Sequence, residues 1–201
     1  ESMTNAPHLS FVRKGLKYGA AVLYDHMALD GLEDAYERGK SMGVFAEQCV
    51  GSYGFRRESM DAFAVASTQR AIAAHNDGSF DWEIAPVTLA GRAGDVAVDR
   101  DEQPFKAKLD KIAALKPAFG KDGTITAATS SSISDGAAAL VLMRASTARA
   151  RGLAPIAVVR AHAVHAQAPA WFSTAPAGAI RKVLQKTGWA VQDVELWEIN
   201  E

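Results

Sequence analysis

Residues 134–143 read SDGAAALVLM and carry the pattern that decides the fold class. A turn at Ser134-Asp135-Gly136 leads into Ala137–Met143, an unbroken apolar run. A run without alternation of apolar and polar residues is typical of a β-strand that is covered on both faces. Ile156–Ala161 is predicted to be a second buried strand, and Val194–Ile199 a third strand, in which apolar residues alternate less cleanly with acidic neighbours.

Helices are predicted between these strands. Ser146–Arg151 ends at Gly152, a common position for glycine after a helix. Pro176–Thr187 has proline in its first turn and Gly188 just past its end, which is the usual asymmetry of helix termini. The order strand, helix, strand, helix, strand predicts an α/β fold with a domain boundary near Ile133.

The chain before this boundary is predicted to contain smaller elements. The clearest is a helix from about Glu58 to His75, with small residues at three- and four-residue steps and a stop signal at Asn76-Asp77-Gly78. Leu29–Tyr53 is predicted to be a helix in two pieces, capped at Asp30 and broken near Gly39 and Gly43. Further predicted elements are strands at Glu83–Leu89, Val96–Val98 and Thr124–Thr126, and a helix at Leu109–Leu115.

The composition is that of an ordinary globular domain. The 201 residues are 48% hydrophobic and 22% charged, with a net charge of -1. This balance gives no electrostatic reason to expect binding to nucleic acid or to an anionic membrane surface. No apolar run approaches the roughly 20 residues that span a bilayer. The single cysteine excludes an internal disulfide framework and fits a reducing, cytoplasmic environment.

Short motifs occur along the whole chain in a fixed order. The segments are Glu1–His8 (ESMTNAPH), Ser41–Glu47 (SMGVFAE), Arg57–Ser67 with Asp61-Ala62-Phe63-Ala64, Glu83–Val87 with Asp101-Glu102, Leu115–Ala127 with Lys116-Pro117, Asp135–Ala139 (DGAAA) and Glu198–Glu201 (EINE). Each is weak alone, but together and in this order they resemble the thiolase family of acyl-CoA acyltransferases.

The resemblance implies the five-layered αβαβα thiolase fold, of which this chain holds the central portion. Residues 1–133 then form the loop domain, which covers the active site and binds coenzyme A (CoA). Residues 134–153 end the N-terminal core half, and residues 154–201 begin the C-terminal core half. Relatives are homodimers or homotetramers, and they use CoA as a substrate without a further cofactor.

The activity implied is thiolytic cleavage of a 3-ketoacyl-CoA, or Claisen condensation of acetyl-CoA, through an acyl-cysteine. Cys49, the only thiol, falls outside the family's nucleophile motif and is predicted to be structural. The nucleophile should precede Glu1 and the catalytic histidine should follow Glu201, so we expect a fragment that is inactive by itself. The alternative is a non-catalytic CoA- or lipid-binding protein of the same fold.

The resemblance also selects candidate site residues. Asn200 matches an asparagine that orders a water in the oxyanion hole, although it could equally cap a turn. The CoA candidates are Ser131, the backbone at Ala127 and Ala128, and the lysines Lys106, Lys108 and Lys111, which could instead be ordinary solvated side chains. Met42 and Phe172 match apolar residues of the acyl pocket, or else belong to the core. His162 and His165 lack partners at metal-ligand spacing, so no metal site is predicted.

Three departures from the family pattern affect the predicted site. Ser41 stands where many thiolases have histidine, and Thr129 replaces the asparagine of the common NASG turn. Ser173-Thr174-Ala175-Pro176 replaces a glycine-rich turn and should reshape the acyl pocket. These changes leave the preferred acyl-chain length and the direction of the reaction open.

Overall fold

The computed structural model describes residues 2–16 and 18–200. The chain divides into two compact units. The middle unit is Val50–Ser131, and the split unit combines Glu1–Cys49 with Ser132–Glu201. The predicted domain limits at 133 and 153 stay predictions.

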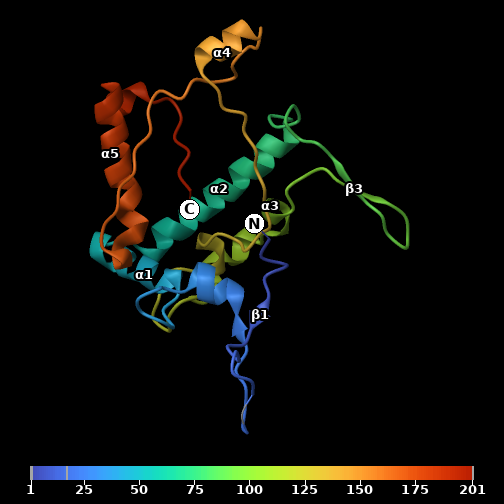
Figure 1. The fold of residues 1–201 in the computed structure, drawn as a ribbon, viewed down its shortest axis with the longest axis vertical. Coiled ribbons are helices and arrows are strands. Elements are labelled where there is room, and N and C mark those ends of the chain that lie inside the picture. The colour runs from blue at the N-terminus through green and yellow to red at the C-terminus, as the bar shows by residue number, and fades with distance from the viewer. Residues whose placement is uncertain (1, 17, 201) are drawn as a thin grey trace. The chain divides into compact units, whose positions relative to one another are not determined.

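The middle unit is built on the long helix α2, Arg57–Asn76. Figure 1 shows it as the straight cyan-to-green helix. It follows an extended residue, Arg56, and it ends before Gly78, whose φ of 76° is a left-handed conformation that glycine adopts without strain. The helix predicted from about Glu58 to His75 is therefore confirmed. Of its predicted stripe, Ala64 is buried, whereas Phe63 is 67% exposed.

An ion pair and two hydrogen bonds from one arginine attach the first turns of α2 to a later segment. The Nε of Arg57 donates to both carboxylate oxygens of Asp61, at 2.9 and 2.8 Å. Its Nη2 donates to the carbonyl oxygens of Ile112 and Leu115, at 3.2 and 2.9 Å. Because Asp61 is 8% exposed, its charge requires this partner.

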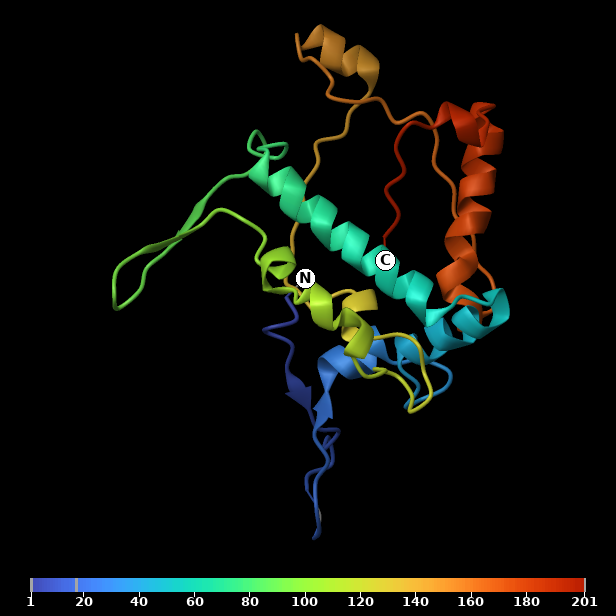
Figure 2. The same ribbon diagram turned by 180° about the vertical axis from the view of Figure 1, so that it is seen from behind.

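Three short helices of the middle unit pack along α2, whereas the hairpin of this unit extends away from it (Figure 2). The helices that contact it are α3 (Gln103–Lys106) and the 3-10 helices η2 (Leu109–Ala114) and η3 (Ala127–Thr129). Ile112 and Ile125 are buried here. The hairpin of β3 (Val87–Leu89) and β4 (Val96–Val98) is antiparallel, pairs Val87 with Val98, and exposes its residues on both faces.

One prediction for this unit is confirmed and one needs correction. The helix predicted at Leu109–Leu115 is present as η2, with the tighter 3-10 winding. Thr124–Thr126 was expected to be a strand, yet the carbonyl of Ile125 accepts from the amide of Ala118, and Thr126 caps η3. The backbone groups of Thr126 are bonded to Thr129 and Ser130, so they are not available for pairing with a strand.

The split unit contains short elements before residue 50. Strands β1 (His8–Leu9) and β2 (Tyr24–Asp25) form a two-stranded antiparallel sheet. They are followed by a π-helical turn η1 (Ala28–Leu32) and by α1 (Met42–Tyr53), whose later residues belong to the middle unit. The two helical pieces predicted for Leu29–Tyr53 are present as η1 and α1, but the break spans residues 33–41, and Gly43 lies inside α1. Asp30 lies inside η1 and does not cap it.

Four helices follow residue 132 in the part of the chain that the structure describes. They are α4 (Ala145–Ala150), η4 (Pro169–Thr174), α5 (Ala175–Thr187) and η5 (Val191–Asp193). α4 and α5 confirm the two predicted helices, whereas the 3-10 helices η4 and η5 were not predicted. Gly152 and Gly188 take left-handed conformations just after α4 and α5, at φ values of 67° and 70°. Both helices therefore end where the glycines predict.

The three strands predicted for the α/β region are wrong as assignments within this structure. Ala137–Met143, Ile156–Ala161 and Val194–Ile199 contain no β-strand, and Leu140 and Leu196 are 86% and 85% exposed. A strand requires a neighbour whose N–H and C=O groups complete the ladder. The only sheets among residues 2–16 and 18–200 are the two hairpin pairs, so these apolar segments have no strand beside them.

Replacing Arg57 by methionine should lower the free energy of unfolding by about 3 kcal/mol, because Asp61 would lose the partner of a nearly buried charge. Urea denaturation of the purified protein measures this change. Arg70→Met, on the exposed face of the same helix, is the control and should change stability by less than about 0.5 kcal/mol. Equal effects of the two substitutions would show that Arg57 does not hold η2 to α2.

Gly178→Ala should destabilise the protein, although alanine favours helices over glycine by about 1 kcal/mol. A methyl group on Gly178 would lie 2.4 Å from Cδ2 of His165. In a His165→Ala background the same substitution should therefore become stabilising, as should Gly51→Ala, where the added methyl meets nothing within 4 Å. Thermal unfolding of the four variants measures the signs, and a stabilising Gly178→Ala in the presence of His165 would contradict the contact.

Candidate functional site

The segment Thr126–Ser131 forms a closed loop in the middle unit. Thr126 is extended, and its hydroxyl accepts from the amide of Ala128 at 3.2 Å. The Thr129 hydroxyl accepts from the amide of Thr126 at 2.9 Å, which makes a reciprocal capping box. Ser131 follows directly and is exposed. The structure thus brings together Ala127, Ala128 and Ser131 on one short loop.

The three predicted lysines lie on the two helical turns that precede this loop. Lys106 ends α3, and its Nζ lies 2.6 Å from Oε2 of Glu102, an exposed ion pair that stabilises little. Lys108 precedes η2 and Lys111 lies within it, and both are exposed without an ion pair to another described residue. These two lysines are therefore available to an anionic ligand.

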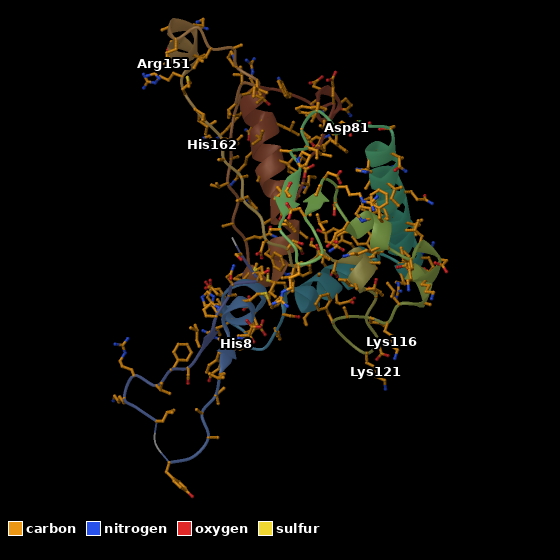
Figure 3. All side chains as sticks on the ribbon, turned by 90° about the vertical axis from the view of Figure 1, so that its right-hand side faces the viewer. His8, Asp81, Lys116, Lys121, Arg151 and His162 are labelled. Atoms are coloured by element: carbon orange, nitrogen blue, oxygen red, sulfur yellow. The ribbon has the colours of Figure 1, made fainter. Side chains whose placement is uncertain are left out.

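The loop after η2 adds two lysines that the sequence analysis did not select. Lys116 and Lys121 are exposed, and Figure 3 labels both on the same loop. The Lys116-Pro117 motif was noted only for its family resemblance. Its position directly after the predicted helix that carries Lys111 could have indicated Lys116 as a further basic side chain near the CoA candidates. Besides the ion-paired Lys106, the exposed lysines of this part of the middle unit are Lys108, Lys111, Lys116 and Lys121.

The remaining candidates belong to the split unit and lie on separate elements. Met42 is the first residue of α1 and is half-buried. Phe172 lies in η4 and is 37% exposed. Asn200 ends the extended segment after η5 and is exposed. That Met42 and Phe172 line one acyl pocket, and that Asn200 lies at the oxyanion hole, stay predictions.

A side-chain amide holds the turn that carries Phe172. The Nε2 of Gln167 donates to Oγ1 of Thr174 at 2.6 Å and also to the carbonyl of Trp171. Thr174 in turn donates to the carbonyl of Trp171 at 3.0 Å. These bonds order the Ser173-Thr174-Ala175-Pro176 turn by polar side chains, where the common thiolase pattern has glycines.

Residues from the start of the sequence bind the side chain of Asp135. The Ser2 hydroxyl donates to Oδ2 of Asp135 at 2.7 Å, and the Thr4 amide donates to Oδ1 at 2.9 Å. The Ser2 hydroxyl, and then the Thr4 amide, hold the pKa of Asp135 below its ordinary value of 3.8 because they stabilise the carboxylate. Two of the motifs that carry the family resemblance are thereby joined.

The free thiol and the possible metal ligands are further candidate functional groups. Cys49 is a free, half-buried thiol on α1. Across residues 2–16 and 18–200, no group of three or more His, Cys, Asp or Glu side chains could hold a metal ion. No helix in the part of the chain that the structure describes is long and apolar enough to cross a membrane.

Ser2→Ala should raise the pKa of Asp135 toward 3.8, because it removes the largest source of the lowered value. The stabilisation by the charged carboxylate is present above the ordinary pKa and is lost as the pH falls through the lowered one. A carboxyl-carbon NMR titration of both proteins measures the two midpoints. Asp77, whose pKa is lowered by Ser79, is the internal control and should not change. An unchanged Asp135 midpoint would show that Ser2 does not bind it in solution.

Family models match nearly the whole chain. The thiolase N-terminal domain matches residues 1–146, and the thiolase C-terminal domain matches residues 153–201. Among curated proteins, acetyl-CoA acetyltransferases of Rhizobium meliloti and Chromobacterium violaceum are each 45% identical to the chain. The alignments cover 100% of this chain and 51% and 52% of those proteins.

Solved structures agree with the sequence matches. The acetyl-CoA acetyltransferase of Bacillus anthracis has a TM-score of 0.86 at 36% identity, over 98% of this chain and 50% of that one. The Acat5 thiolase of Ascaris suum, solved in complex with coenzyme A, has a TM-score of 0.89 at 39% identity, over 100% of this chain and 51% of that one. The expected thiolase fold is confirmed, and the chain, which spans about half the length of these relatives, belongs to the thiolase family.

Proposed function

We propose that the protein carrying this chain is an acyl-CoA acyltransferase that transfers an acyl group between a 3-ketoacyl-CoA and CoA. The observation that carries the proposal is 40–45% identity to acetyl-CoA acetyltransferases along the entire chain, without a gap in coverage. In thiolysis an enzyme thiolate attacks the 3-keto carbon, acetyl-CoA leaves, and the thiol of free CoA then takes the acyl group. The reverse sequence is Claisen condensation.

Within this scheme the middle unit supplies the CoA platform. The neutral, amide-containing arm of CoA suits the backbone groups of Ala127 and Ala128 and the hydroxyl of Ser131. Its phosphates suit the exposed ammonium groups of Lys108 and Lys111, whereas Lys106 must first leave Glu102. Support for this assignment comes from the likeness, over the whole chain, to a thiolase solved with coenzyme A.

The split unit supplies residues for the acyl group and the developing negative charge. Phe172 and Met42 present apolar side chains for the acyl pocket. Asn200 carries a neutral amide that donates hydrogen bonds at any working pH, as an oxyanion donor must. A thiolate nucleophile and a general base complete the chemistry, and by family resemblance both are outside these 201 residues.

Two further properties, the cellular compartment and the oligomeric state, belong to this proposal. We place the protein in the cytoplasm, and we expect a homodimer or homotetramer. Light scattering of the purified full-length protein would test the oligomeric state.

The first experiment is a measurement of the intact mass of the purified natural protein, followed by a thiolysis assay with acetoacetyl-CoA. A mass near 21.4 kDa with no turnover would agree with the predicted inactivity of this chain alone. A mass near twice that value should be accompanied by thiolysis. A full-length protein that binds CoA without turnover would instead be a non-catalytic binding protein and would refute the proposal.

Asn200→Ala should lower kcat for thiolysis by about 100-fold in the full-length protein, because loss of one oxyanion donor typically costs this much. KM for CoA should change little, since the donor acts on the developing charge. Steady-state kinetics measures both values. Asn76→Ala, at the exposed end of α2, is the matched control. A kcat within twofold of the wild type would remove Asn200 from the catalytic residues.

A further inference from the structure

Thr126 is the most deeply buried residue among those described in the chain, with no exposed surface. All its polar groups are nevertheless satisfied within the next four residues. Its hydroxyl accepts from the amide of Ala128, and its amide donates to the hydroxyl of Thr129 at 2.9 Å. Its carbonyl accepts from the amide of Thr129 at 3.1 Å and from the hydroxyl of Ser130 at 2.8 Å.

Thr129 closes this arrangement through a single hydroxyl oxygen. That oxygen accepts from the Thr126 amide, and its proton points to the Thr126 carbonyl at 3.3 Å. A hydroxyl can donate and accept at once, so this one bonds to both the N–H and the C=O group of the buried Thr126. Without it, a buried N–H group would have no partner, because Thr126 is closed to water.

The loop is also fixed at its start to the rest of the middle unit. Ile125 is 7% exposed, and its carbonyl accepts from the amide of Ala118 at 2.9 Å. The preceding segment is in turn held by Arg57 through the carbonyls of Ile112 and Leu115. A rigid helix therefore sets the position of Thr126, and the capping box sets the path of the chain from there to Ser131.

We propose that Thr126 and Thr129 are positioning residues for CoA: they contact no reacting atom, but they fix the backbone that receives the neutral arm of CoA. This inference rests on the proposed function, in which Ala127, Ala128 and Ser131 bind CoA. A loop already held in its binding conformation loses less conformational freedom when the ligand arrives. Thr129, which departs from the common thiolase pattern, then acts through the loop on affinity for CoA.

The test compares Thr129→Val with Thr129→Ser in the full-length protein. Valine matches the shape of threonine but lacks the hydroxyl, and serine restores it. Thr129→Val should raise KM for CoA about tenfold and leave kcat within twofold, whereas Thr129→Ser should stay within twofold of the wild type in both. Thr88→Val, in the exposed hairpin strand β3, is the control for a lost threonine hydroxyl.

Hydrogen exchange adds a readout that does not depend on turnover. In Thr129→Val the amides of residues 126–131 should exchange at least tenfold faster, with no change in α2. Equal KM values and exchange rates for Thr129→Val and the wild type would overturn the inference. So would failure of serine to rescue, or global unfolding of the valine variant, because either would assign the hydroxyl a purely structural role.

Failure of the proposed function itself would look different. Wild-type protein would then bind no CoA in calorimetry, whatever residue 129 is. If only the positioning role fails, the wild-type protein still binds CoA, and the failure appears in the comparison of Thr129→Val and Thr129→Ser.

Discussion

The side chain of Arg57 is the constraint on which the middle unit depends. Its guanidinium reaches Asp61 one turn along α2 and two carbonyl oxygens of a segment more than fifty residues later. A planar group with several fixed donors can satisfy a carboxylate and backbone carbonyls together, which a lysine could not do. Because Asp61 is nearly buried, the pair is either complete or strongly destabilising, and this gives the helix and η2 one well-defined arrangement.

The position of the candidate CoA loop, Thr126–Ser131, depends on this arrangement of α2 and η2. α2 holds η2, the segment after η2 pairs with Ile125, and Ile125 leads into the capping box at Thr126. Each step is a hydrogen bond of 3.2 Å or less between named backbone or side-chain groups. Binding groups supported by rigid elements in this way are held more accurately than groups on an unsupported loop.

Local signals explain what the sequence predicted well. α2 was predictable because its periodicity and its Asn76-Asp77-Gly78 stop lie within the helix and the residues next to it. The helix end at Gly188 was predictable for the same reason, because glycine just past the last turn is a local signal. The capping box was missed, although a threonine followed three residues later by another hydroxyl-bearing residue resembles the known capping pattern. Strands were different: a strand in Ala137–Met143 depends on neighbours that its own residues do not specify.

The contact between Ser2 and Asp135 has a consequence for biosynthesis. The two residues are separated by 133 positions, so the opening motif cannot be anchored until the ribosome has made Asp135. At about 5–20 residues per second, this delay is roughly 7–27 s. During that time α2 and its partners, whose contacts are nearer in sequence, can already have folded. The middle unit, which ends before Asp135, is therefore expected to fold before Ser2 and its neighbours are anchored.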